Sequence, residues 1–216
     1  MNDTILQEIR EIHESIKNRI EERLSEFTRV WEEGSEEKLF FELVFCLLTP
    51  GARARNAWSC LETIRTNGLL MHGDTNRISL CLNLVRFKNN KARNIVEARR
   101  LFRGIGKVSM RAALNGAGDD YGKREWLVSS VRGMGYKEAS HFLRNVGFYN
   151  ELAILDRHVL KNLSRVELIP SVPQPLTKKR YLETEKNFRE LAIRLRIPMS
   201  HLDFVFWYRE TGDIFK

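Results

Sequence analysis

A short glycine-rich segment between two helical patterns is the feature that most constrains how this chain can fold. An apolar run ends at Arg132, the tripeptide Gly133–Gly135 follows, and a second helical pattern begins near Tyr136. Glycine tolerates positive φ and lets another backbone approach closely. This segment therefore predicts a tight hairpin between two helices. Backbone N–H groups at the start of the second helix are then exposed and can bind a phosphate.

Two ionisable residues follow this segment at a defined spacing. Lys137 stands in the first turn of the second helix, and Asp156 comes 19 residues later, after an apolar stretch. The positive end of the helix dipole disfavours an ammonium at Lys137, and a neutral lysine amine is a nucleophile. Taken singly, each feature is more often structural, because an exposed lysine is usually solvated and an aspartate before a helix is usually an N-cap. The functional alternative is that the two residues act together as a catalytic pair.

The hairpin and the two ionisable residues resemble the active-site motif of the helix-hairpin-helix DNA glycosylases. Residues 131–137 and 155–158 match that motif in type and spacing. The neighbouring segment 138–145 and the tail 206–216 are similar to the small 8-oxoguanine DNA glycosylases of archaea and some bacteria. A lysine at this position is typical of the bifunctional members, which remove a base and also nick the strand. Gly51 departs from the family, which often has a polar residue near this position.

The apolar pattern predicts an all-α protein. Apolar positions recur at helical spacing along the chain, and no strand-like alternation of useful length occurs. We expect about nine or ten helices from the helix start and stop signals. The resemblance implies the two-lobed helix-hairpin-helix glycosylase fold, with the active site in the cleft between the lobes. Residues 35–147 would form the lobe that carries the hairpin, and residues 1–34 together with 148–216 would form the second lobe.

The resemblance also implies a reaction. The enzyme would excise 8-oxoguanine and cleave the strand by β-elimination, with Lys137 as the nucleophile that forms a Schiff base. Asp156 would stabilise the positive charge that develops on the sugar and help to activate the lysine. This chemistry needs no cofactor and no catalytic metal. Three alternatives stay open: a glycosylase for another oxidised base, a non-catalytic helix-hairpin-helix protein that binds DNA, and a helical scaffold that binds no DNA.

The end of the chain is expected to recognise the damaged base. In 8-oxoguanine N7 carries a hydrogen, whereas in guanine N7 is an acceptor. An acceptor placed at N7 therefore selects the lesion, and the terminal carboxylate, the last carbonyls or the ammonium of Lys216 would lie near the base. The resemblance implies that Lys216 acts in lesion recognition and that Trp207 stacks on the base. Phe87 is expected on the opposite face of the base, and a place in the core is the alternative for this ring.

The charge distribution predicts a nucleic-acid surface. The net charge is +8, and residues 86–111 hold nine Lys/Arg against one Glu, whereas residues 1–37 hold five Lys/Arg against eleven Asp/Glu. A basic segment favours a polyanionic partner, although a merely soluble basic surface is the alternative. The residues expected to bind the DNA backbone are Gly133, Gly135, Arg132, Arg99, Arg100 and Arg103.

The remaining composition bears on cellular location and cofactors. The three cysteines have no paired spacing, which argues against a disulfide framework and excludes a four-cysteine iron–sulfur cluster. A charged amphipathic helix opens the chain directly, so we expect no signal peptide, and no apolar run is long enough for a membrane span. We therefore expect a monomer that works in the cytoplasm of a prokaryote, at the nucleoid, on double-stranded DNA containing a damaged base.

Overall fold

The computed structural model describes residues 3–102, 109–172 and 175–216, and within these ranges its regular structure is entirely helical. This agrees with the fold class predicted from the sequence. The twelve described helices are α1 (Asp3–Glu32), α2 (Glu36–Leu48), α3 (Ala54–Thr66), α4 (Leu69–His72), α5 (Thr75–Leu80), α6 (Lys88–Phe102), α7 (Met110–Gly116), α8 (Asp120–Ser130), α9 (Tyr136–Asn145), α10 (Arg157–Arg165), α11 (Lys178–Leu195) and α12 (Met199–Thr211).

The expected helix count was too low, because α4 and α7 are too short to show a clear apolar period. Side-chain caps begin several of the longer helices: the Ser35 hydroxyl accepts the N–H of Lys38 at 3.2 Å at the start of α2. Helix α12 starts after Pro198 without a side-chain cap, and Asp203 lies buried inside it, paired with Arg144.

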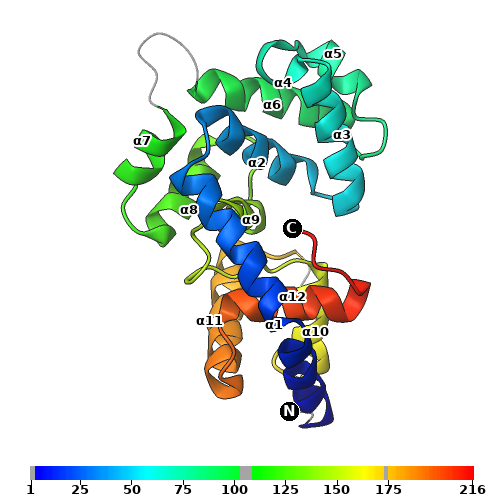
Figure 1. Cartoon of the computed structure of the whole chain (residues 1–216), viewed down its shortest axis with the longest axis vertical. Helices are drawn as coiled ribbons and strands as arrows, with labels where there is room; N and C mark the ends of the chain where they lie inside the picture. The colour runs from blue at the N-terminus through cyan, green and yellow to red at the C-terminus, as the bar shows by residue number, and fades with distance from the viewer. Residues whose placement is uncertain (1–2, 103–108, 173–174) are drawn as a thin grey trace.

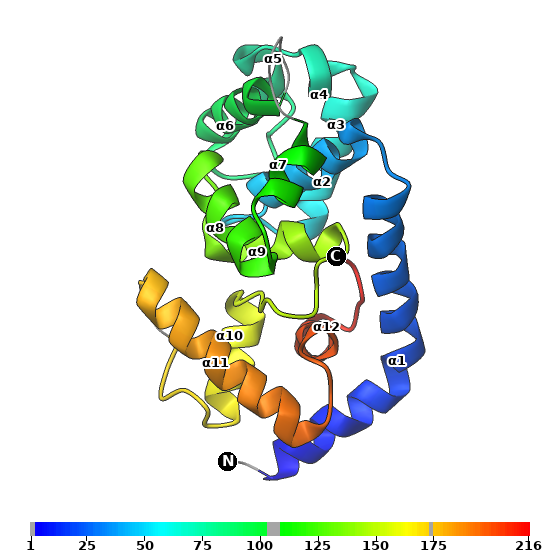
Figure 2. The ribbon, with the colours of Figure 1, turned by 90° about the vertical axis from the view of Figure 1, so that its left-hand side faces the viewer.

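Two separate hydrophobic cores organise the molecule. One core extends from Leu39 to Leu152 and is built by α2 to α9. The other joins apolar residues of α1 to residues between Ala153 and Ile214, from α10, α11 and α12. In Figures 1 and 2 the first group of helices forms the upper lobe and α10 to α12 form the lower lobe, with the C-terminus between them. These two cores support the two-lobed division predicted from the sequence, whose boundaries stay a prediction.

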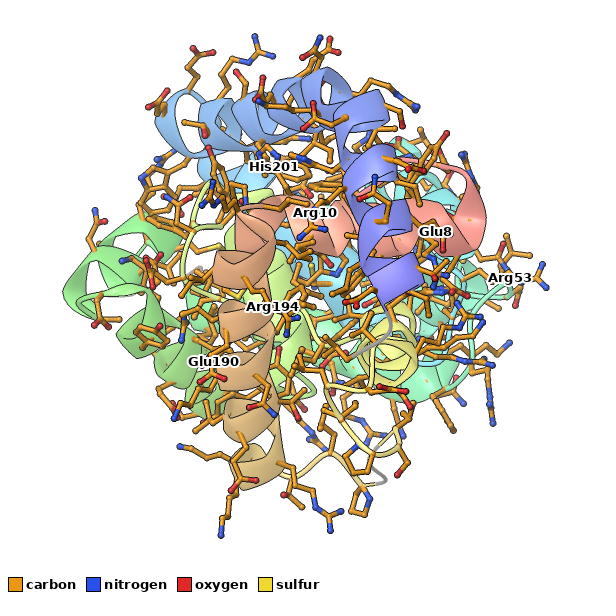
Figure 3. All side chains as sticks on the ribbon, turned by 90° about the horizontal axis from the view of Figure 1, so that it is seen from below. Glu8, Arg10, Arg53, Glu190, Arg194 and His201 are labelled. Atoms are coloured by element: carbon orange, nitrogen blue, oxygen red, sulfur yellow. The ribbon has the colours of Figure 1, made fainter. Side chains whose placement is uncertain are left out.

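The long helix α1 connects the two lobes. Most of it packs on α12, and its C-terminal end reaches α2 and α9. Seen from below, α1 crosses α12 (Figure 3), and the labelled Glu8 accepts hydrogen bonds from Arg209 of α12 at 2.9 and 2.7 Å. At the other end, Gly147 has a φ of +96°, and a Cβ there would lie 3.2 Å from Cα of Thr28. Glycine is therefore required where α1 meets the segment that enters the lower lobe.

A buried ion pair between α8 and α11 joins the lobes on another side. The guanidinium of Arg124 donates to both carboxylate oxygens of Glu185 at 2.6 and 2.9 Å, and the two side chains are only 2% and 4% exposed. The same carboxylate accepts the backbone N–H of Ala153 at 2.8 Å. The pair therefore ties the upper lobe to the segment that leads into Asp156.

Removing one partner of this pair should be strongly destabilising. We expect Arg124→Met to lower the free energy of unfolding by roughly 3–5 kcal/mol, because it leaves a buried carboxylate without its cation. Urea unfolding followed by circular dichroism measures this loss. Adding Glu185→Leu to the same chain should recover part of it, although the N–H of Ala153 then lacks an acceptor. A single replacement that costs less than about 1 kcal/mol would show that the pair does not hold the lobes together.

No helix in the described part of the chain combines the length and apolar character that a membrane span requires.

Candidate active site

A cavity of about 820 Å³ lies between the two lobes, and helices of both lobes contribute to its wall. Four of the residues predicted from the sequence line it, and they come from three separated parts of the chain. They are Lys137 from α9, Asp156 before α10, Trp207 from α12 and the C-terminal Lys216. The fold therefore brings the predicted nucleophile, carboxylate, aromatic ring and chain terminus to one site.

The hairpin before α9 has the geometry that its glycines predict. Gly133 has a φ of +83°, and a Cβ there would lie 2.0 Å from Nδ2 of Asn94 on α6, so no other residue fits without displacing that side chain. Met134 is buried in the upper core, while Arg132 is exposed and pairs with Glu97 of α6 at 3.1 Å. Gly135 is the N-cap of α9, and no side chain in the described chain caps this end. The N–H groups of the first turn are thus open to an anion.

Lys137 is the second residue of α9 and points into the cavity. Its Nζ lies 3.1 Å from the hydroxyl oxygen of Thr49 and 3.6 Å from Oε1 of Glu138. Its side chain is 22% exposed, so the amine can be reached from the cavity. Thr49 stands at the C-terminal end of α2, 88 residues away in sequence. This contact was not predictable from the local motif.

Asp156 is the N-cap of α10, as its place in the sequence suggests. Its Oδ1 accepts the backbone N–H groups of His158 and Val159, both at 2.8 Å. Both bonds end on Oδ1, so the capping role does not use Oδ2. The side chain lines the cavity that also holds Lys137. The residue thus combines a structural role with a carboxylate placed at the site.

The cavity wall also contains a buried carboxylate that the sequence did not indicate as part of the site. Asp203 of α12 is paired with Arg144 of α9, and both are buried. Burial raises the pKa of Asp203 to about 6, Arg144 opposes this, and the nearby carboxylate of Asp156 adds to the rise. The sequence held one indication of this carboxylate: Arg144 follows Lys137 on the same helix, and a buried arginine needs an acidic partner.

His141 is a further cavity residue that motif reasoning missed. It lies one helical turn after Lys137, and among the described residues neither of its ring nitrogens has a hydrogen-bond partner of good geometry. Burial lowers the pKa of this imidazole well below its usual value, helped by the cations of Arg144, Lys137 and Lys216, while the backbone of Lys216 acts in the opposite direction. A neutral imidazole offers one donor and one acceptor to the site.

The C-terminal tail docks between the lobes through its apolar residues. Phe215 packs edge-on against Phe45 and Trp58 of the upper core, with ring centroids 6.3 and 5.9 Å away. The ammonium of Lys216 donates to both oxygens of Glu42 at 2.6 and 2.7 Å, and Glu42 is fully buried. Burial lowers the pKa of Lys216, and Glu42 opposes this. The ammonium is therefore held in the upper lobe.

The two predicted stacking residues are placed differently. Trp207 lines the cavity and stands edge-on to His158, with centroids 4.8 Å apart, while its Nε1 is buried without a hydrogen-bond partner in the described chain. Phe87 is 63% exposed, with a φ of +59°, and lies beside Gly51. It is not one of the described residues that line the cavity, and the alternative of a core position is wrong.

The three arginines that were expected to bind the DNA backbone differ in their surroundings. The guanidinium of Arg99 donates to the carbonyls of Leu69, Leu70 and Gly73 at 3.3, 3.1 and 2.6 Å, so it holds the end of α4. Arg100 is exposed. Arg103 lies outside the described residues.

Comparison with known proteins agrees with this geometry. The sequence pattern of the family described as "8-oxoguanine DNA glycosylase" matches residues 20–197. The chain belongs to this glycosylase family. A relative from Fusobacterium nucleatum, named 8-oxoguanine DNA glycosylase/AP lyase, is 43% identical over 97% of this chain and 96% of its own. A relative of the same name from Korarchaeum cryptofilum is 38% identical over 93% and 92% of the two chains.

Solved structures of this glycosylase family have the same fold. The crystal structure of the 8-oxoguanine DNA glycosylase of Thermotoga maritima superposes with a TM-score of 0.88, at 36% identity and over 99% of both chains. The 8-oxoguanine glycosylase/lyase of Methanocaldococcus jannaschii, in complex with a 15mer DNA containing 8-oxoguanine, superposes with a TM-score of 0.87 at 32% identity, over 99% of this chain and all of that one. The two-lobed all-α architecture is therefore that of the 8-oxoguanine DNA glycosylases.

Proposed function

We propose that this glycosylase excises 8-oxoguanine from double-stranded DNA and then cleaves the strand at the resulting abasic site. The observation that carries the proposal is the convergence of Lys137 and Asp156 on one cavity between the lobes. An amine nucleophile and a carboxylate on two different elements are the groups that this reaction needs. Relatives of 43% and 38% identity bear the name of this activity, and one solved relative holds DNA with the same lesion.

The reaction begins with extrusion of the damaged nucleotide into the cavity, because C1′ cannot be reached inside the stacked duplex. The neutral amine of Lys137 attacks C1′, the N-glycosidic bond breaks, and the base leaves with the bonding electrons and takes up a proton. The Asp156 carboxylate stabilises the positive charge that the sugar carries in the transition state.

Strand cleavage follows from the covalent intermediate. The lone pair of the Lys137 nitrogen forms a C=N bond to C1′ as the C1′–O4′ bond breaks, and O4′ takes up a proton and becomes a hydroxyl, which opens the sugar ring. The imine acidifies C2′, which loses a proton, and the C3′–O bond breaks to release the 3′ phosphate by β-elimination. Water then hydrolyses the imine and frees the amine of Lys137. Each step uses groups of the protein and the substrate, so the proposal calls for no cofactor and no catalytic metal.

DNA is held by its backbone in this proposal. The open N–H groups at the start of α9 bind a phosphate, and exposed cations such as Arg100 and Arg132 add sequence-independent attraction. Arg99 is engaged with the end of α4 in the free protein, so a contact between Arg99 and DNA stays a prediction. One chain supplies both walls of the cavity, which supports action as a monomer. Relatives in bacteria and archaea support work at the nucleoid, in the cytoplasm of a prokaryote.

The decisive experiment uses duplexes that each carry a single lesion. The protein is incubated with 8-oxoguanine, an oxidised pyrimidine, plain guanine and a pre-formed abasic site, and strand nicks and borohydride-trapped imine are scored on denaturing gels. Nicking and trapping with 8-oxoguanine, but not with plain guanine, supports the proposal. A preference for another lesion makes the enzyme a glycosylase for a different oxidised base. Salt-dependent binding without nicking or trapping leaves only a helix-hairpin-helix protein that binds DNA.

Removing Lys216, or extending the chain beyond it with a tag, should impair excision of 8-oxoguanine by about 100-fold or more, because a pocket that loses its matched acceptor loses its discrimination. The ammonium is paired with Glu42 and cannot accept a hydrogen, so in this proposal a carbonyl or carboxylate oxygen of the tail accepts N7–H. Single-turnover excision measures the effect. Nicking of a pre-formed abasic site involves no base contact and should largely survive. Equal loss on both substrates would mean that the tail stabilises the fold and does not read the base.

A further inference from the structure

A second lysine lies buried directly behind the cavity wall. Lys91 of α6 is 4% exposed, and its Nζ donates to the carbonyls of Leu48 and Pro50 at 2.7 and 2.8 Å. These two carbonyls flank Thr49, so one amine holds both ends of the short segment that closes α2. Burial lowers the pKa of Lys91 to about 8. Lys91 is buried, whereas residues 88–90 in the first turn of the same helix are exposed.

The segment held by Lys91 carries the hydroxyl that contacts the nucleophile. Thr49 donates its own hydroxyl hydrogen to the carbonyl of Cys46 at 2.9 Å. A hydroxyl has one hydrogen, so towards Lys137, 3.1 Å away, the Thr49 oxygen can act only as an acceptor. Lys137 must therefore direct one of its N–H bonds at Thr49.

This arrangement orients the reactive electron pair. A neutral amine has two N–H bonds and one lone pair. Thr49 accepts one of these bonds, and Oε1 of Glu138, 3.6 Å from Nζ, lies on a second side of the amine. With one N–H held by Thr49 and the second attracted by Glu138, the lone pair is left for the cavity that Lys137 lines. A nucleophile with a preset direction loses less orientational freedom when it attacks.

We propose that Lys91 is a positioning residue for Lys137: it fixes the backbone of residues 48–50 so that the Thr49 hydroxyl orients the attacking amine. This inference rests on the proposed function, because it assumes that Lys137 forms an imine. It adds two residues to the reaction, and both act through Lys137. Their partners are 43 and 88 residues away in sequence, which is why the motif around Lys137 does not reveal them.

The test measures the single-turnover rate of borohydride trapping at a pre-formed abasic site, with duplex affinity measured separately. Thr49→Val removes the acceptor and keeps the shape, whereas Thr49→Ser keeps the hydroxyl. Lys91→Met removes the amine and keeps the apolar stem. We expect Thr49→Val and Lys91→Met to slow trapping by roughly 10- to 100-fold, since small misplacements of a reacting group have effects of this order. Duplex affinity should stay within about threefold of the unaltered protein, and Thr49→Ser should restore most of the rate.

Lys123→Met is the matched control for loss of a buried lysine. Lys123 is also buried in the upper lobe, donates to the carbonyl of Gly118 at 2.7 Å, and does not line the cavity in the described chain. This variant should lose stability as Lys91→Met does but keep its trapping rate. If Lys123→Met slows trapping as much as Lys91→Met does, the effect of Lys91 comes from a general loss of stability, and the proposal is overturned.

The double variant Thr49→Val/Lys91→Met separates positioning from a direct effect of charge. Two residues that act through one contact are not additive, so the double variant should trap no more slowly than the slower single variant. If the two effects multiply, Lys91 acts independently of Thr49 and the proposal fails. If Lys91→Met does not fold, the comparison of Thr49→Val with Thr49→Ser still tests the proposal. Equally slow trapping by both Thr49 variants would overturn it. Absence of trapping by the unaltered protein would instead contradict the proposed function itself.

Discussion

Replacing Lys137 with Gln is expected to abolish imine trapping and strand nicking while the protein still binds duplex DNA. Glutamine has a similar length and stays polar, but its amide nitrogen carries no basic lone pair, so no imine can form. We expect a loss of roughly 1000-fold or more, because removal of a covalent nucleophile eliminates the reaction path and does not merely weaken one contact. Borohydride trapping on 8-oxoguanine and abasic duplexes, together with a binding assay, measures both parts of the prediction.

Lys179→Gln serves as the control for loss of a positive charge. Its side chain is 87% exposed on α11, away from the described cavity wall. This variant should trap and nick like the unaltered protein. Persistent trapping by the Lys137→Gln variant would mean that another amine forms the imine, and digestion of the trapped complex would then locate it. Loss of duplex binding together with activity would show that the replacement disturbs the hairpin.

The parts of the site that the sequence predicted are those coded within short stretches. The hairpin, Lys137 and the N-cap Asp156 lie within a stretch of 25 residues, from Arg132 to Asp156, and local geometry sets each of them. Gly133 requires positive φ, Lys137 falls in the first turn because the helix starts after Gly135, and Asp156 caps because an apolar helix follows. Such features depend little on the rest of the fold, so spacing alone is informative.

The parts that the sequence did not reveal depend on contacts between distant elements. Lys216 finds Glu42 across 174 residues, and nothing near Glu42 marks it as the acceptor for a chain terminus. Arg99 holds backbone carbonyls at the end of α4, a contact that the sequence did not indicate, and its expected contact with DNA stays a prediction. The exposure of the Phe87 ring depends on the course of the chain after α5, and its expected contact with the base stays a prediction.

Replacing Asp156 with Asn should separate the two roles of this residue. The amide oxygen of asparagine can accept the N–H groups of His158 and Val159 as Oδ1 of Asp156 does, and asparagine caps helices about as well as aspartate. A neutral amide cannot balance the positive charge of an oxocarbenium-like sugar. Excision of 8-oxoguanine should therefore fall by roughly 100- to 1000-fold, as when a group that stabilises transition-state charge is removed. The thermal midpoint should move by no more than about 2 °C, because a cap change of a few tenths of a kcal/mol has little effect in a chain of this size.

Asp119→Asn is the matched control, because Asp119 is also an N-cap whose Oδ1 accepts a backbone N–H, from Gly122 at 2.8 Å. It begins α8, is exposed, and is absent from the described cavity wall. Both variants should have nearly unchanged melting curves, and only the one at Asp156 should lose excision. Single-turnover excision and differential scanning calorimetry on the same preparations provide the two readouts. Near-normal excision by a folded Asp156→Asn protein would reduce Asp156 to a helix cap, and the charge on the sugar would then have to be balanced by another carboxylate of the cavity wall, such as Asp203 or Glu138.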